Sequence, residues 1–307
     1  MISSFQHLSL SVPDVAAGRD FYRDFGMQPV DRGDSVAMRC VGRDQDQVVL
    51  FEGPRREVHH RTYGVLPGTL ADTRRGLERA GVELLDAPVQ HGGEGVWLRD
   101  PHGYVVHLTE RADAGSAGDA RIAWNTPGHF ERLGDRGCPT PQLPTRPRRL
   151  GHIIVFSPDP DALARFYIEH LGMRLSDRVG DGFAVFLRTQ GDSDHHVLGL
   201  LRNPQRGLHH ASFEVGSLDE MQLGMLRMQD AGHRHAWGLG RHVVGSNYFQ
   251  YFRDPYGSMA EYFVDIDHIP ADQDWEARDW GKDGMFLWSV DGPPPEDFAH
   301  NYYADEG

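Results

Sequence analysis

Apolar and polar positions alternate in the same way in two stretches of the chain, one near its start and one near its middle. Residues 6–14 and 151–159 each predict an apolar strand that begins with a histidine, His7 or His152. A helical pattern follows in each copy, with Phe-Tyr and then Gly-Met at matching offsets. The chain therefore contains an internal repeat, which shapes every later assignment.

Each copy continues with the same further elements. An aspartate precedes the first predicted helix, Asp14 or Asp159, and aspartate is a preferred N-cap residue. A second helix closing on Ala-Gly, an Arg-Asp-Pro-x-Gly turn and a last strand then follow, at 71–80, 99–103 and 104–109 and again at 218–231, 253–257 and 258–264. Each copy predicts a βαβββ unit, single or doubled. We therefore expect an α+β fold of tandem βαβββ modules in two domains.

Composition shifts divide the chain into four segments. The segment between the copies is rich in Gly, Ala, Asp and Pro and lacks sustained periodicity, so it predicts a linker. The segment after the second copy carries Trp275, Trp280 and Trp288, which is too aromatic for a solvated tail. The predicted segments are an N-terminal domain at 1–111, a linker at 112–148, a second domain at 149–268, and a tail at 269–307 that packs over the second domain.

Length and charge narrow the class of protein. The 307 residues suffice for two domains, and 39% hydrophobic with 25% charged residues is typical of a globular protein. A net charge of -14 leaves no basic stripe for phosphates, so we expect no nucleic-acid partner. The sequence shows no signal peptide and no apolar run long enough for a bilayer, so we expect a cytoplasmic protein with no membrane partner. The two cysteines predict neither a disulfide framework nor a thiolate metal site.

One charged residue stands out in the last predicted strand of the second copy. Alternation places Glu261 on the same face as Met259 and Phe263. Burying an ionised carboxylate costs several kcal/mol unless it is paired or bound to a metal. A cation is therefore expected opposite Glu261.

Two histidines lie at equivalent ends of other predicted strands of this copy, His152 and His210. Two histidines and one carboxylate on strands of one sheet can form a facial triad, which holds Fe(II) or Mn(II) and leaves three positions open. The chain has 18 histidines, so a single strand histidine carries little weight. The conjunction of the two histidines with Glu261 carries the hypothesis.

A longer motif in the second copy is similar to that of a known family. It runs from Gly-x-His through Tyr-x-x-Asp-Pro-x-Gly to Glu, here Gly240, His242, Tyr251, Asp254, Pro255, Gly257 and Glu261. Over nearly its whole length the chain resembles the two-module form of the type I extradiol ring-cleaving dioxygenases, which are catechol 2,3-dioxygenase-like members of the vicinal oxygen chelate superfamily. One departure is Gln250, where the family has an aliphatic residue or Phe before the tyrosine.

The resemblance implies roles for individual residues. The metal ligands would be His152, His210 and Glu261. The catalytic residues would be His196, His242 and Tyr251. His195 competes with His196, and the spacing to His210 favours His196. Strand alternation lets only one of His209 and His210 face the metal. Periodicity alone favours His209, whereas the resemblance implies His210.

The resemblance also implies a chemistry. A catecholic small molecule and O2 would bind a non-haem Fe(II) centre, or Mn(II), and the ring would open beside the diol to a muconic semialdehyde-type product, as in aromatic hydrocarbon catabolism. We expect a homo-oligomer. The first copy is interpreted as structural and non-catalytic, because it keeps His7 and has His107 in place of Glu261, while the position matching His210 falls near Thr62.

Two other functions stay open at this point. A glyoxalase or epimerase-like metalloenzyme of the same superfamily needs a second carboxylate at the site, and the sequence offers none. A metal-free sequestering protein of the resistance type has no use for a full triad. For the substrate, relatives that accept acidic catechols use arginine before His242, where this chain has Trp237. We therefore predict an apolar or aryl substituent, with the aromatic tail closing over it.

Overall fold

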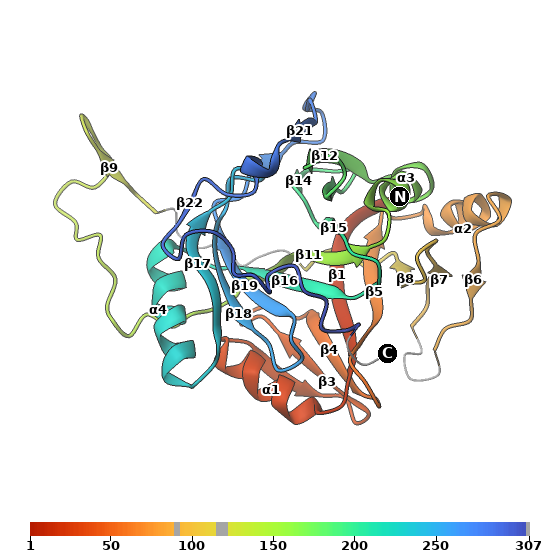
Figure 1. Ribbon diagram of the computed structural model, residues 1–307, viewed down its shortest axis with the longest axis horizontal. Helices are drawn as coiled ribbons and strands as arrows, with labels where there is room; N and C mark the ends of the chain where they lie inside the picture. The colour runs from red at the N-terminus through yellow and green to blue at the C-terminus, as the bar shows by residue number, and fades with distance from the viewer. Residues whose placement is uncertain (89–92, 115–121, 305–307) are drawn as a thin grey trace.

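Two large mixed β-sheets, two two-stranded sheets and four α-helices make up the computed structural model, which describes residues 1–88, 93–114 and 122–304 (Figure 1). The predicted linker and tail each include residues outside these ranges, 115–121 and 305–307. Residues 89–92 also lie outside them. The rest of the fold is described by its two domains.

The first domain contains two βαβββ units that share one eight-stranded sheet. The first unit consists of β1 (Ile2–Val12), α1 (Val15–Asp24), β2 (Gln28–Asp31), β3 (Ser35–Arg39) and β4 (Asp46–Glu52). The second consists of β5 (Glu57–Val65), α2 (Leu70–Arg79), β6 (Leu84–Leu85), β7 (Val96–Arg99) and β8 (Val105–Thr109). The strand order is β2-β3-β4-β1-β5-β8-β7-β6, so the first strands of the two units pair at its centre.

The second domain repeats this arrangement in a ten-stranded sheet. Its first unit consists of β11 (Arg149–Ser157), α3 (Pro160–Leu171), β12 (Arg174–Val179), β13 (Ala184–Arg188) and β15 (Leu198–Arg202). Its second unit consists of β16 (Leu208–Glu214), α4 (Leu218–Asp230), β17 (His235–Arg241), β18 (Tyr248–Arg253) and β19 (Met259–Val264). Strands β11, β16 and β19 are neighbours near the centre of the sheet.

Short elements from the linker and the tail complete the structure. The linker forms a hairpin of β9 (Asn125–Thr126) and β10 (His129–Phe130), which lies away from both domains (Figure 1). In the tail, β21 (Arg278–Trp280) pairs with β12, and β22 (Trp288–Ser289) pairs with β17. The other short elements are β14 (Ser193–Asp194), β20 (His268–Ile269) and a 3₁₀ turn at Lys282–Gly284.

The predicted fold class, an α+β fold of tandem βαβββ modules, is confirmed. The structure adds that each copy of the repeat is a doubled unit. The carboxylates of Asp14 and Asp159 accept hydrogen bonds from the amides of Ala17 and Ala162, both at 2.9 Å, as N-caps do. Long-range alternation and local capping signals therefore agree with the observed elements.

A shared core joins the two domains through their helices. From α1 and its C-cap, Phe25 stacks on Tyr262 of the second sheet with ring centroids 3.9 Å apart. From α3, the Tyr167 hydroxyl lies 2.6 Å from an Arg61 guanidinium nitrogen, and Arg61 also binds the Asp100 carboxylate at 2.9 Å. These contacts, all buried, fix the second sheet against the first.

Among the described helices, none combines the length and apolar character needed to cross a bilayer.

Candidate metal centre and active site

Three neighbouring strands bring the predicted ligands together. In register, His152 of β11 faces Ser212 of β16, and Ser212 faces Glu261 of β19. His210 lies two residues before Ser212 and so emerges on the same side of the sheet. The Glu261 Oε2 atom is 3.3 Å from His152 Nε2 and 3.4 Å from His210 Nε2. The structure therefore places one oxygen and two imidazole nitrogens around a common point.

Two of the three converging atoms have no hydrogen-bond partner among the described residues. Glu261 is fully buried, and neither its Oε2 atom nor His210 Nε2 makes a hydrogen bond with the described residues. Its other oxygen accepts a hydrogen bond from the side-chain amide of Asn247 at 3.3 Å. Buried lone pairs without partners are costly unless a cation binds them. Among the described residues, His152, His210 and Glu261 form the one group of three or more His, Cys, Asp or Glu side chains whose ligand atoms all lie within 4.8 Å of one another.

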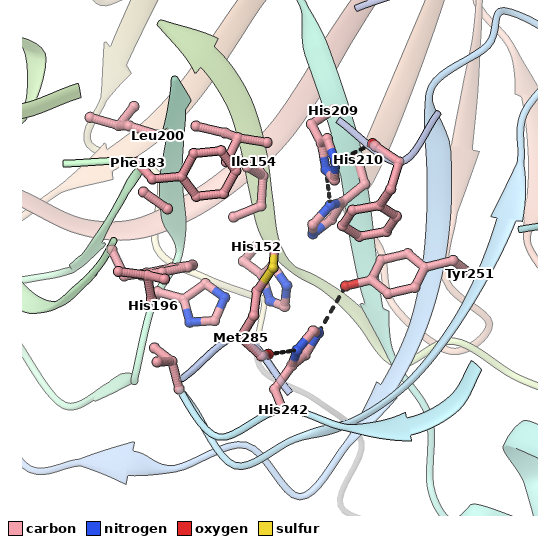
Figure 2. Close-up of a pocket in the computed structure, with 16 residues that line it drawn as sticks. His152, Ile154, Phe183, His196, Leu200, His209, His210, His242, Tyr251 and Met285 are labelled. Carbon is pink, nitrogen blue, oxygen red and sulfur yellow. Dashed lines mark hydrogen bonds between the residues drawn. The ribbon is translucent and has the colours of Figure 1, made fainter. Parts of the chain in front are cut away.

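A β-bulge settles the choice between His209 and His210. On β11, Ile154 pairs with His210 and Val155 pairs with Leu208, so His209 is an extra residue on β16. Strict alternation does not hold across a bulge, and both histidines line the same cavity. Of the two, only His210 has a nitrogen grouped with the ligand atoms of His152 and Glu261. His210 approaches Glu261, whereas His209 lies behind it (Figure 2).

Hydrogen bonds fix the tautomer of His210. The Nε2–H group of His209 donates to the backbone carbonyl of Phe298 at 2.8 Å, so its Nδ1 atom accepts from the Nδ1–H group of His210 at 2.7 Å. The Nε2 lone pair of His210 is then directed to Glu261. Burial lowers the pKa of His209 to about 3 and that of His210 well below its usual value, with neighbouring imidazoles adding to the effect on His210. Both rings are therefore neutral, as metal coordination requires.

His242 and Tyr251 form a pair across the cavity from His196 (Figure 2). The Nδ1–H group of His242 donates to the carbonyl of Met285 at 2.6 Å, so Nε2 accepts from the Tyr251 hydroxyl at 3.0 Å. Burial raises the pKa of Tyr251, and the Glu261 carboxylate raises it further. Burial also lowers the pKa of His242, which outweighs the opposite effect of Glu261. The pair therefore presents a protonated phenol to the site.

His196 and His195 take different places. His196 lines the cavity, with its ring centroid 4.2 Å from that of His152. His195 is fully buried behind it and binds the Asp177 carboxylate at 3.1 Å. Gly245, with φ at +87°, passes close to the His196 ring. A Cβ atom at this position would lie 3.3 Å from His196 Cε1. Of the two histidines, His196 is the one in a position to contact a bound molecule.

The cavity above the triad is mostly apolar (Figure 2). Its walls come from β11, β12, β13, β15 and the tail, and they include Ile154, Val179, Phe183, Ala184, Phe186, Leu200, Leu201, Val244, Met285 and Phe298. Among the described residues that line it, none is Lys or Arg. The tail does close over the cavity, but through Met285 and Phe298.

The aromatic residues singled out in the sequence lie elsewhere. Trp237 is fully buried beside Tyr251 and donates its indole N–H to the Gly292 carbonyl at 3.1 Å. Trp275 and Trp280 bind the backbone of Ser176 and the carboxylate of Asp177 behind His195. Their indole N–H groups need buried acceptors, which the cavity wall does not supply. Gln250 accepts a hydrogen bond from Gln222 of α4 at 3.5 Å and donates one to His235 of β17 at 2.9 Å, so it lies away from the Tyr251 ring.

The first domain repeats the register but not the chemistry. Ser9 pairs with His60 there, as Ile154 pairs with His210, and Thr62 pairs with His107 as Ser212 pairs with Glu261. The match for His210 is therefore His60, and the expected match near Thr62 is wrong. A bulge displaces the alignment, because Ser9 and Leu10 pair with His60 and Val58.

Sequence reasoning missed three side chains that support the site. Asn247 orients Glu261, and the signal was present, because Asn247 lies inside the quoted motif. His209 accepts a hydrogen bond from His210, and Asp177 accepts one from His195. Asp177 lies on another strand with no local signal. Tertiary structure alone reveals that contact.

The fold and this site define a metal-binding member of the vicinal oxygen chelate class. The family model "Glyoxalase/Bleomycin resistance protein/Dioxygenase superfamily" matches residues 4–108 and 149–262, and the chain belongs to this superfamily. The chain is 36% identical to metapyrocatechase 2 of Cupriavidus necator over 98% of this chain and 92% of that protein. It is 26% identical to an iron-dependent extradiol dioxygenase of Rhodococcus jostii, over 94% and 97%.

A solved structure shares the same fold. The Mn(II)-bound glyoxalase of Novosphingobium aromaticivorans aligns with a TM-score of 0.78 and 22% identity, covering 97% of this chain and 93% of that one. Together with the sequence relatives, this match confirms the predicted fold and the resemblance to the extradiol dioxygenases.

Proposed function

We propose that this protein is a metal-dependent extradiol dioxygenase that opens a catechol ring with O2 beside the diol, giving a muconic semialdehyde-type product. The observation that carries the proposal is the convergence of His152 Nε2, His210 Nε2 and Glu261 Oε2 at the base of an apolar cavity. The relationship to metapyrocatechase and to an extradiol dioxygenase over nearly the whole chain supports the reaction class.

The donor set suits a divalent non-haem metal. Two neutral imidazoles and one carboxylate fit Fe(II) and Mn(II), and the iron-dependent relative favours Fe(II). When bound, the metal would chelate the two catechol oxygens and provide a site for O2. The protein's own side chains then set which substrate enters and how its protons move.

Three side chains beside the triad would act on the substrate. The Tyr251 hydroxyl donates to His242 and so can accept a hydrogen bond from a catechol hydroxyl, and His196 on the other side of the cavity can hold or release a proton. Burial lowers the pKa of His196 well below its usual value, and the imidazoles around it lower it further. His196 is therefore neutral at neutral pH, and one of its ring nitrogens has a lone pair that can accept a hydrogen bond or a proton.

The cavity wall favours a catechol with an apolar or aryl substituent. Burying such a group contributes about 2–3 kcal/mol. A carboxylate in the same place would lose its hydration without gaining a cation, because the described lining contains neither Lys nor Arg. Arg241, the nearest motif arginine in the sequence, binds Asp265 and the Tyr248 hydroxyl instead.

Two alternatives fit the structure less well. A glyoxalase or epimerase-like enzyme moves a proton with a carboxylate base beside the ligands, and no carboxylate other than Glu261 is grouped with the described site. A sequestering protein of the resistance type needs no metal and gives no reason for buried, unpartnered ligand atoms. Neither uses His196, His242 and Tyr251 together.

The test is an anaerobic preparation loaded with Fe(II) or Mn(II) and mixed with catechols and O2. We expect a ring-opened, yellow semialdehyde product, and 3-alkyl or 3-aryl catechols should have higher kcat/KM than dihydroxybenzoates. His210→Ala should lose both metal and activity. His7→Ala, at the first-domain position that matches His152, should keep both. A His210→Ala protein that retains one metal per chain would refute the ligand assignment.

We also propose a homo-oligomer. The linker hairpin exposes Trp124, Phe130 and Leu133 to 56%, 62% and 80%, and two-residue strands do not stabilise a hairpin alone. Exposed apolar groups on a projecting arm suit burial against a second copy (Figure 1). Light scattering measures the mass directly. A cytoplasmic location stays a prediction from the sequence.

A further inference from the structure

Two buried side chains, His195 and Asp177, are linked to His196 by hydrogen bonds. The Nδ1 atoms of His195 and His196 are 3.1 Å apart, and His195 Nε2 is 3.1 Å from Asp177 Oδ2. His195 is fully buried, and Asp177 and His196 are nearly so. The line Asp177–His195–His196 therefore runs from the interior to the cavity wall without reaching solvent.

The donors and acceptors in this line can be assigned. A carboxylate accepts only, so His195 Nε2 carries a hydrogen and donates it to Asp177. In neutral His195 the Nδ1 atom then has a lone pair, which accepts from the Nδ1–H group of His196. His196 is left with an unprotonated Nε2 atom, the ring nitrogen available to the cavity.

The second histidine pair of this site provides an internal comparison. His209 and His210 have the same wiring, but the outer ring donates to the Phe298 carbonyl instead of a carboxylate. A carbonyl gives little stabilisation to an imidazolium, and burial lowers the pKa of His209 to about 3. The pair that holds a metal ligand therefore stays neutral. His195 differs because an acidic group faces it.

Asp177 is held as an anion. Burial raises its pKa, but hydrogen bonds from His195, from the Arg278 amide at 2.7 Å and from the Trp280 indole at 3.0 Å outweigh this effect and leave the pKa lowered. Both donors of the last two bonds belong to β21 of the tail. The tail strand therefore fixes the carboxylate opposite His195.

The other ionisable groups around this pair are already occupied. Arg188 of β13 binds the Ser176 hydroxyl and has its pKa lowered to about 10 by burial, with Asp177 acting in the opposite direction. Asp194, next to His195 in the chain, is ion-paired with Arg149 and His268. Trp275 of the tail packs edge-to-face against His195. The backbone carbonyl of Asp267 accepts a hydrogen bond from the His195 amide. Asp177 is therefore the counter-ion that His195 meets.

We propose that Asp177 and His195 form a buried proton store that positions His196 and takes over the proton His196 accepts from the substrate. The proposal rests on the proposed function. A proton that leaves a catechol hydroxyl binds His196 Nε2, the Nδ1 proton of His196 moves to His195 Nδ1, and the positive charge lies on His195 beside Asp177. Return of the proton reverses each transfer, so no other reactant is needed. Asp177 and His195 touch neither substrate nor metal in this scheme and are positioning residues.

The test compares Asp177→Asn and His195→Gln with the matched control Asp161→Asn. Each of the two substituted side chains, in Asp177→Asn and in His195→Gln, keeps a similar shape and can form hydrogen bonds. It cannot carry the charge of the residue that it replaces. Asp161 pairs with Arg178, the neighbour of Asp177 on β12, so its variant removes a nearby carboxylate without touching the relay. We expect kcat to fall about tenfold to hundredfold in both relay variants, with metal content and anaerobic catechol affinity unchanged. The control should keep wild-type kcat.

The pH dependence of kcat distinguishes the proposed proton store from a role in packing alone. Removing the carboxylate destabilises the imidazolium form of His195, so the acid limb of kcat should move to lower pH in Asp177→Asn, by about one unit. An unchanged acid limb together with wild-type kcat in both relay variants would overturn the proposal. If Asp177→Asn does not fold because the tail strand detaches, His195→Gln retains the Asp177 bonds to Arg278 and Trp280 and supplies the kinetic test.

A second readout does not depend on turnover. In histidine-labelled, metal-free protein, the ¹H–¹⁵N ring signal that disappears in His195→Gln reports the tautomer of His195. We expect the Nε2–H form in the wild type and protonation at a lower pH in Asp177→Asn. An Nδ1–H form would overturn the relay. If the wild-type enzyme cleaves no catechol while this signal behaves as expected, the proposed function fails and the proton store stands.

Discussion

The burial of Glu261 leads to a stability test with an unusual sign. Its Oε2 atom lies between the His152 and His210 rings, and only Oε1 has a hydrogen-bond donor, from Asn247. A buried, incompletely paired carboxylate costs several kcal/mol, and one charged hydrogen bond returns about 1.5–3 kcal/mol of this. Glu261→Gln keeps the shape and removes the charge. We therefore expect the metal-free variant to be more stable than the metal-free wild type by about 1–3 kcal/mol.

Metal should reverse this order. Ligand at a hundred times its Kd stabilises the native state by about 2.7 kcal/mol, and Glu261→Gln forfeits that gain along with its anionic ligand. Urea and thermal unfolding in excess chelator and in excess Mn(II) measure both terms. Glu220→Gln is the matched control, because Glu220 is equally buried but bound by Arg148 at 2.7 Å. That control should be destabilised by about 3–5 kcal/mol with or without metal.

Two results would refute the reasoning. A Glu261→Gln protein less stable than the wild type in chelator would mean that the carboxylate is satisfied by the protein itself. An equal rise in Tm with Mn(II) for both proteins would mean that the metal binds elsewhere.

Three further predictions concern the rest of the molecule. Arg61→Ala leaves Asp100 buried without its cation, so urea unfolding should show a loss of about 3–5 kcal/mol. Burial lowers the pKa of His107 to about 4, whereas the pKa of an unfolded histidine is about 6.5. Between these pH values the unfolded chain therefore binds one more proton than the folded chain. Stability should therefore fall with pH from about 6.5 to 4, by up to about 1.4 kcal/mol per unit, and His107→Gln should flatten that slope. Replacing Trp124 and Phe130 by Ser should shift the mass measured by light scattering to the single chain, while an unchanged mass would exclude the arm.

The sequence predicted what depends on periodicity and on residues close in the chain. The repeat follows from strand alternation, and the helix starts follow from Asp14 and Asp159, whose caps act within three residues. The predicted ligands came from a motif and a family resemblance, and the structure brings those side chains together. Gln250 shows the limit of residue type, since its partners lie on α4 and β17.

Tertiary structure decided the rest. No pattern in Leu208–Glu214 announces the bulge that turns both His209 and His210 to one cavity, because a bulge depends on the neighbouring strand. Asp177 lies 18 residues before His195, and Trp280 lies 103 residues after Asp177. Such contacts have no local signal. The aromatic tail was therefore predicted over the substrate, although Trp275 and Trp280 pack behind His195.

The two domains separate what the fold supplies from what the side chains supply. His7, His60 and His107 stand at the register positions of His152, His210 and Glu261, so the two sheets offer the same geometry twice. In the first domain, however, Thr62 binds His7 Nε2 at 3.1 Å and His107 Nδ1 at 3.3 Å, and Ser9 binds His60 Nε2 at 3.2 Å. These hydroxyls satisfy the nitrogens that a metal would need. In the second domain Ile154 replaces Ser9, a carboxylate replaces His107, and His210 Nε2 is left without a donor or acceptor. A metal site on this fold thus depends on removing hydrogen-bond partners as much as on adding ligands.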